Sequence, residues 1–226
     1  MDDLLPAFQD SLFNATLADS AIDLAEIAID TILVDGVFQE IPIVKILVGV
    51  GKFICTVRER NFLKQTFCFF SHLHDGSISS NEFSKYKREL EEDPTKAERE
   101  LSRVMILLDK TIDTEKAEDL AAFFRAYIKN DMSWDDFCEL SEALDRLFVI
   151  DIQMLNRIAN LEHKMLFEEG GHSADRLVSV GLVVNPATRI QIGFGSTPPF
   201  GKCPVSLTEF GRTFLQHAGI DNLILD

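Results

Sequence analysis

Two histidines and an aspartate lie within four residues of one another in the run His72-Leu73-His74-Asp75. Imidazole nitrogens and carboxylate oxygens are ordinary zinc ligands, so this spacing could contribute to a metal site. A zinc site needs third and fourth ligands as well, and this loop does not supply them. We therefore expect surface or capping roles for these histidines and for the three isolated ones elsewhere, and we predict no metal and no cofactor.

The same segment looks like the end of an EF-hand calcium loop. Residues 75–78 read Asp-Gly-Ser-Ile, and Glu82 and Phe83 stand at the twelfth and thirteenth places. The first and third places, which should hold acids, are Ser71 and Leu73. Calcium needs several converging oxygen ligands. We interpret the segment as a helix–helix turn followed by a capped helix start.

Motifs that would indicate an enzyme are absent from the sequence. The chain has no nucleophile elbow, phosphate-binding loop, dinucleotide fingerprint or HExxH run. Its acidic pairs, such as Asp135-Asp136, fall at predicted helix ends, where they suit the helix dipole or solvent. We predict a non-enzymatic protein with no small-molecule substrate.

The first forty residues carry nine acids and no lysine or arginine. Four of these acids recur at helical spacing and form one stripe: Asp19, Asp23, Glu26 and Asp30. Like charges at that spacing repel on an isolated helix, so the stripe favours a cationic partner. The next segment is basic and apolar. We therefore predict that a helix over 19–35 packs antiparallel to a helix over 43–71.

Residues 41–57 form the apolar run IPIVKILVGVGKFICTV. A membrane-spanning helix needs about 20 apolar residues, and two lysines interrupt this run. One interpretation is a buried amphipathic helix. The other is a membrane-active hairpin over 19–72, whose acidic helix shields the basic one and whose glycines allow close contact. The candidate membrane or partner residues are Lys45, Gly49, Gly51, Lys52, Arg58 and Arg60.

Charge and cysteine usage limit the remaining classes. The net charge of -15 argues against general nucleic-acid affinity. The four cysteines contain no CxxC pair, and the N-terminus lacks the basic region of a signal peptide. We expect a cytoplasmic protein with reduced cysteines, peripheral at the membrane if 41–57 is membrane-active.

Helical periodicity extends to about residue 168. After the helix over 43–71, capping signals begin helices at Ser79, Pro94, Asp113 and Ser133, and the last runs to about 161 with a break near Asp151. The apolar stripes of these helices predict a core. Its expected members are Phe69, Leu107, Phe123, Trp134, Leu144 and Phe148.

The chain changes character after Gly170-Gly171. A short helix runs into Gly181-Leu182-Val183, two further extended pieces follow, and Leu207-Thr208-Glu209-Phe210-Gly211 opens a last helix, capped by Ser206 and closed by Gly219. This run resembles the end of a bacterial winged-helix domain. The resemblance implies a small α+β module over 169–226, behind a mainly α multi-helix bundle over 1–168.

Winged helices serve both DNA binding and protein pairing. The candidate DNA contacts are Arg176, Arg189 and Lys202, but residues 173–226 contain four cations and four acids and no basic patch. We therefore favour an interaction or regulatory protein that binds a protein partner or self-associates. A membrane-active effector and a DNA-binding regulator remain as alternatives.

Overall fold

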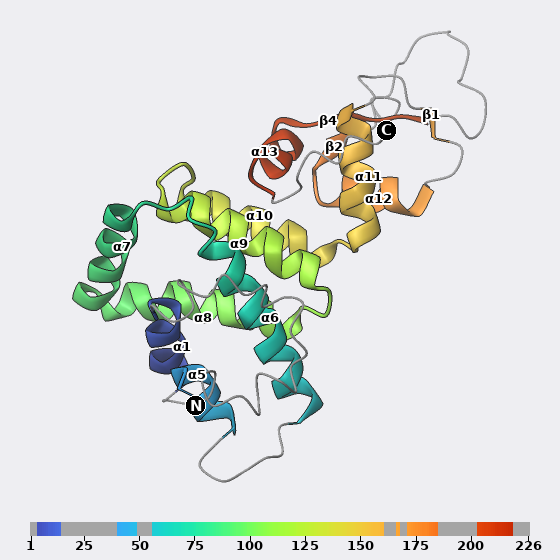
Figure 1. The fold of residues 1–226 in the computed structure, drawn as a ribbon. Coiled ribbons are helices and arrows are strands. Elements are labelled where there is room, and N and C mark those ends of the chain that lie inside the picture. The colour runs from blue at the N-terminus through green and yellow to red at the C-terminus, as the bar shows by residue number, and fades with distance from the viewer. Residues whose placement is uncertain are drawn as a thin grey trace, which may run out of the picture. The chain divides into compact units, whose positions relative to one another are not determined.

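Helices dominate the described part of the chain in the computed structural model, which confirms the expected mainly α fold (Figure 1). The structure describes residues 4–14, 40–48, 56–160, 166–167, 171–184 and 203–218. The chain divides into two compact units, 1–137 and 138–226. The domain boundary at residue 168, between the helical bundle and the C-terminal module, stays a prediction.

The first unit is built around the phenylalanine-rich helix α6. In chain order its described elements are α1 (Leu4–Leu12), α5 (Pro42–Val48), α6 (Val57–Leu73), α7 (Ser80–Glu92), α8 (Pro94–Lys110) and α9 (Thr114–Ile128), and α10 (Trp134–Arg146) begins in it. Helix α6 packs on α9 and α8, while α1 packs on α5 and α8. Three phenylalanines of α6 are fully buried, and their rings meet Phe8 of α1 at 5.1 Å and Phe124 of α9 at 5.7 Å.

The continuous helix predicted over 43–71 is wrong. Thr56 has an extended backbone, and its hydroxyl accepts a hydrogen bond from the Glu59 N–H while the Glu59 carboxylate accepts from the Thr56 N–H. This capping box begins α6 at Val57, because both end groups are satisfied without a preceding helical turn. Residues 49–55 lie outside the described residues, as does the predicted helix over 19–35 with its acidic stripe and its antiparallel packing.

A buried carboxylate joins three helices of the first unit. Glu100 of α8 is fully buried and accepts hydrogen bonds from the hydroxyls of Tyr86 at 3.0 Å and Tyr127 at 2.8 Å. Arg99 adds a contact at 3.1 Å from the surface side. Burial and the neighbouring carboxylate raise the pKa of both tyrosines, so they stay protonated donors.

Four of the six predicted core residues are buried: Phe69, Leu107, Phe123 and Leu144. Trp134 is partly buried and stacks on Phe137. Phe148 is 59% exposed, so its predicted burial is wrong. The physical reason is a helix break: α10 ends at Arg146 and α11 (Val149–Asn160) begins after Phe148, which takes Phe148 off the apolar stripe.

The second unit contains α11, β1 (Leu166–Phe167), α12 (Gly171–Ser179), β2 (Val183–Val184), β3 (Cys203–Pro204), β4 (Ser206–Leu207) and α13 (Glu209–His217). Strands β2 and β4 pair antiparallel, with Val183 opposite Leu207, and β1 pairs with β3. The predicted short helix running into a strand is confirmed. The first of the two further extended pieces, over 189–195, and Gly219 lie outside the described residues.

The N-cap of the last helix lies two residues later than predicted. Thr208, not Ser206, is its N-cap, and its hydroxyl accepts from the Gly211 N–H at 2.9 Å. The same hydroxyl donates to the Gly181 carbonyl, which ties α13 to the start of β2. A Cβ at Gly211 would lie 2.0 Å from the Leu182 carbonyl oxygen, so only glycine permits this close approach.

Candidate metal centre

One face of α6 carries polar side chains toward α9 and the link before it. Asn61 and Gln65 donate to the carbonyls of Thr111 and Ile112, each at 2.7 Å. The Cys68 thiol, further along the same face, donates to the Thr114 carbonyl at 3.5 Å. These positions are spaced by about one helical turn, so one face of α6 forms hydrogen bonds with the backbone from residue 111 into the first turn of α9.

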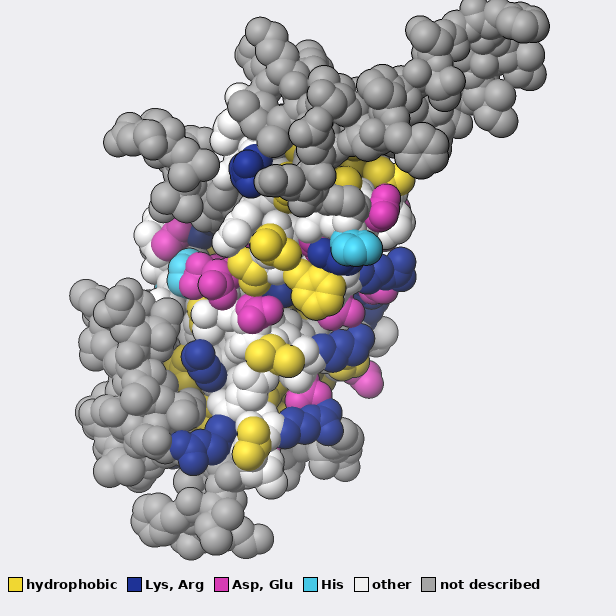
Figure 2. All heavy atoms as spheres, turned by 90° about the vertical axis from the view of Figure 1, so that its right-hand side faces the viewer, with side chains coloured by type: hydrophobic (Ala, Val, Ile, Leu, Met, Phe, Trp, Pro, Cys, Tyr) yellow, Lys and Arg dark blue, Asp and Glu magenta, His cyan; other side chains and the backbone are white. Residues whose placement is uncertain are grey.

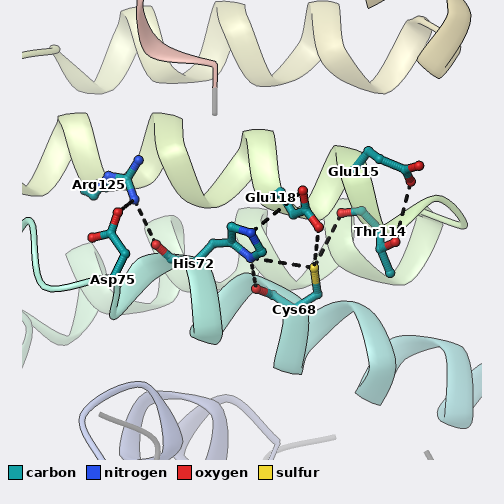
Figure 3. Close-up of polar contacts among 7 residues, drawn as sticks. All are labelled: Cys68, His72, Asp75, Thr114, Glu115, Glu118 and Arg125. Atoms are coloured by element: carbon teal, nitrogen blue, oxygen red, sulfur yellow. Dashed lines mark hydrogen bonds and ion pairs between the residues drawn. The ribbon is translucent and has the colours of Figure 1, made fainter. Parts of the chain in front are cut away.

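Cys68, His72 and Glu118 converge where this face meets α9 (Figure 3). The Cys68 sulfur lies 3.7 Å from Glu118 Oε1 and 3.9 Å from His72 Nδ1. His72 Nε2 lies 3.7 Å from Glu118 Oε2. One ligand atom from each residue falls within 4.8 Å of the others.

The imidazole of His72 is held in a defined orientation. Its Nδ1 lies 3.0 Å from the backbone carbonyl of Cys68, and a carbonyl can only accept, so Nδ1 carries the proton. In the neutral ring Nε2 is then a lone-pair donor on the Glu118 side. Metal-ligating histidines commonly show this pattern, in which one nitrogen donates to a carbonyl and the other faces the ion.

The separation between His72 and Glu118 suits a small ion better than a direct hydrogen bond. A contact of 3.7 Å between His72 Nε2 and Glu118 Oε2 is too long for a hydrogen bond. Zinc–ligand distances of about 2.0–2.3 Å in a tetrahedron place ligand atoms about 3.4–3.6 Å apart. The ligand atoms, which lie within 4.8 Å of one another, would have to move closer together to enclose zinc.

The donor set favours metal binding over nucleophilic catalysis. A thiolate, an imidazole and a carboxylate together suit Zn²⁺ or Co²⁺, whereas Mg²⁺ and Ca²⁺ prefer oxygens alone. The Cys68 side chain is fully buried, which denies a substrate carbonyl access to the sulfur. His72 and Glu118 are 38% and 33% exposed, so an ion can enter from their side.

The rest of the His72–Asp75 run serves the fold. Arg125 of α9 donates to the His72 carbonyl at 2.8 Å and pairs with Asp75 (Figure 3). The Asp75 carboxylate also accepts from the Ser77 N–H. His74 lies 2.9 Å from the Leu12 carbonyl and edge-on to Phe83. Burial lowers the pKa of His74, although its bond to Leu12 opposes this.

Comparison with protein-family models, curated proteins and solved structures finds no match to this chain.

The structure separates the residues that the sequence had grouped. It brings His72 together with Cys68 and Glu118 rather than with His74 and Asp75. The four-residue spacing of Cys68 and His72 already indicates that the two side chains share one face of a helix. Glu118 carries no such signal, because only the packing of α9 on α6 places it there.

The described part of the apolar run 41–57 contributes one buried face to the core, while Ile46 and Val57 are exposed. Ile41, Ile43 and Val44 are at most 1% exposed, and the Ile43 N–H donates to the buried Ser11 hydroxyl of α1. Among the described helices none is long and apolar enough to cross a bilayer. The face drawn in Figure 2 carries hydrophobic side chains in separate groups among charged ones.

The cations proposed for membranes or partners are partly engaged within the chain. Lys45 pairs with Glu40 at 2.7 Å, and Arg58 donates from Nε and Nη2 to the two carboxylate oxygens of Asp109. Arg60 lies half-buried in the first turn of α6. The remaining candidates of that group, Gly49, Gly51 and Lys52, lie outside the described residues.

Arg176, proposed as a DNA contact, is engaged inside the second unit. Its guanidinium makes two hydrogen bonds to the fully buried Asp151 carboxylate, at 2.6 and 2.7 Å. It also lies over the exposed ring of Phe148, 4.8 Å from the centroid. Arg189 and Lys202 lie outside the described residues.

Proposed function

We propose that this chain is a non-enzymatic regulatory protein whose first unit binds a divalent transition metal, zinc foremost, through Cys68, His72 and Glu118. The observation that carries the proposal is the convergence of one ligand atom from each residue within 4.8 Å. Two of the ligands come from α6 and one from α9. Bound metal would therefore link the two helices that form the centre of the unit.

The charge of the cluster supports a cation between its members. In the part of the chain that the structure describes, the polar partners of the Glu118 carboxylate are the Cys68 thiol and the His72 ring, with no lysine or arginine. A divalent ion neutralises the carboxylate and the thiolate that it creates from Cys68. Metal binding at this site should therefore release the thiol proton and strengthen as pH rises.

The regulatory part of the proposal follows from what the chain's other features do not favour. DNA reading is disfavoured by the net charge of -15 and by the engagement of Arg176 with Asp151. A membrane-active hairpin is disfavoured by the burial of Ile41, Ile43 and Val44 within the chain's own helices. The winged-helix-like C-terminal module is then proposed to pair with protein, either a partner or a second copy.

The test is a titration of the metal-free full chain with Co²⁺, which substitutes for zinc and absorbs light. We expect visible bands of a tetrahedral centre and a near-ultraviolet thiolate-to-cobalt band, both displaced by added Zn²⁺ at one equivalent. Cys68→Ser should lose the thiolate band, and His72→Ala and Glu118→Gln should weaken binding at least tenfold.

Matched controls change the same three residue types outside the cluster. Glu115→Gln changes an exposed carboxylate of the same helix, Cys138→Ser changes a thiol of the other unit, and His172→Ala changes an exposed histidine. All three should keep wild-type spectra. A folded wild-type chain with no Co²⁺ spectrum, or a spectrum unchanged in Cys68→Ser, would refute the metal site.

The self-association part has its own measurement. Light scattering on the metal-free and zinc-loaded chain gives the molar mass in each state. A dimer in either state supports pairing of copies, whereas a monomer in both states leaves a different protein as the expected partner.

A further inference from the structure

We infer that the metal bound at Cys68, His72 and Glu118 keeps one coordination position for an exogenous small thiolate. This inference rests on the proposed function, because it describes what the same site would do once it is loaded. It names a ligand class, a low-molecular-weight thiol, that would reach the protein only through the metal.

The count of donors is the first argument. Zinc in proteins takes four ligands, and sites with three protein ligands fill the fourth position with water or an external ligand. Among the described residues, the metal-ligating side chains that converge here are the three named. The nearby Thr114 carbonyl already accepts from Cys68 and, as the first residue of α9, also faces the amide one turn on.

One internal donor must be tested as a rival for the fourth position. Gln65 lies one turn before Cys68 on α6, and its buried Oε1 has no hydrogen-bond partner. Its Nε2 is held by the Ile112 carbonyl at 2.7 Å. An amide oxygen is a poor ligand for a thiolate-bound zinc ion compared with a second sulfur.

The exposure of the ligands places the open position on the solvent side. Cys68 is buried at the closed end, whereas the side chains of His72 and Glu118 are each about a third exposed. Figure 3 shows the His72 ring of α6 and the Glu118 side chain of α9 pointing toward each other. A ligand that completes the tetrahedron opposite Cys68, His72 and Glu118 would therefore approach from water.

The chemistry of the first three ligands selects sulfur. The ion, the Cys68 thiolate and the Glu118 carboxylate together are neutral, so hard anions gain little from simple charge attraction. A soft thiolate forms the stronger bond to a borderline metal. In the exchange a thiol displaces the bound water and transfers its proton to solvent, and the metal keeps its oxidation state.

The experiment adds 2-mercaptoethanol, in small excess, to the Co²⁺-loaded full chain. We expect a saturable gain in the thiolate-to-cobalt band and a shift of the visible bands, with no loss of cobalt. Mass spectrometry under native conditions should detect protein, metal and thiol in a one-to-one-to-one complex. Gln65→Met should leave the thiol-dependent change intact, and Glu115→Gln serves as the neutral control.

The outcomes separate this inference from the proposed function. Absence of any Co²⁺ spectrum refutes the metal site itself. A Co²⁺ spectrum that depends on Cys68 but does not respond to thiol overturns only the open position. Removal of cobalt by the thiol, or a wild-type spectrum that changes in Gln65→Met before any thiol is added, overturns it as well.

Discussion

Two polar clusters, each formed where two helices pack together, surround a carboxylate with different partners. In the second unit, Asp151 of α11 is fully buried and is bound by the Arg176 guanidinium of α12 and by the Phe148 N–H at 2.9 Å. In the first unit, Glu118 of α9 meets a thiol and an imidazole of α6 at 3.7 Å. Among the described residues, Asp151 is paired with a cationic side chain and Glu118 is not.

The difference separates a structural cluster from a candidate site. Asp151 also caps the start of α11, so its lone pairs are used by short, charge-assisted bonds. No ligand is needed to complete that arrangement. The contacts around Glu118 are long, and its partners are a thiol and an imidazole, side-chain types that bind transition metals, so the proposed cation would bind all three groups.

The largest expected effect comes from removing the Asp151 carboxylate, which leaves Arg176 without its partner. Asp151→Ala should lower the free energy of unfolding by about 2–4 kcal/mol, less than a fully buried pair would lose because Arg176 reaches solvent. Urea denaturation measures the change. Asp175→Ala, an exposed acid on α12, is the control and should stay near wild type. An equal loss in both variants would contradict the structural role of Asp151.

Binding of zinc at Cys68, His72 and Glu118 should have the next largest effect. Zinc at about 100 times its dissociation constant should stabilise the wild-type chain by about 2.7 kcal/mol, and a chelator should remove the gain. Thermal unfolding with and without zinc measures it. Cys68→Ser should lose most of the gain and Cys138→Ser should keep it. A zinc effect of equal size in both variants would place the ion elsewhere.

The Asp151–Arg176 pair should also make the free energy of unfolding depend on pH in acid. Burial raises the pKa of Asp151, but the bonds from Arg176 and the Phe148 N–H outweigh this and hold the pKa below its ordinary value of 3.8. Its stabilisation is therefore present above that ordinary value and is lost as pH falls through the lower, folded value. Asp151→Asn should flatten this part of the stability profile measured by urea denaturation between pH 5 and pH 2.

His74 adds a separate, smaller pH dependence in the first unit. Burial lowers its pKa below the ordinary value of 6.5, so the unfolded chain takes up a proton first and stability falls as pH drops below 6.5. His74→Gln should remove this slope from urea denaturation curves, and His172→Ala should retain it. A slope that persists in His74→Gln would assign the effect to another group.

The smallest expected effect distinguishes the two carboxylates directly. Without metal, Glu118→Gln should change the free energy of unfolding by about 0.5 kcal/mol or less, because the side chain is partly exposed and has no short bond. Comparison of Glu118→Gln with Asp151→Ala tests whether the cluster of Cys68, His72 and Glu118 stabilises the metal-free fold. A loss as large as that of Asp151→Ala would make Glu118 a structural residue.

Local signals in the sequence predicted much of the helical framework. Ser79 with Glu82 forms the predicted capping box, and Pro94 opens α8 behind Asp93. The predictions failed where two local signals competed. The apolar run suggested one helix through residue 56, but the capping box of Thr56 and Glu59 overrode it. Phe148 followed the apolar period, but the helix break at residues 147–148 left it exposed.

The sequence by itself determined where most described helices begin, because caps and apolar period act over a few residues. It also placed Cys68 and His72 one turn apart on α6. Only the tertiary structure decided that Glu118, some fifty positions along the chain, meets them. It likewise decided that Arg176 binds Asp151. Both pairings depend on how helices pack, and packing depends on the fit of whole apolar faces, which no local spacing encodes.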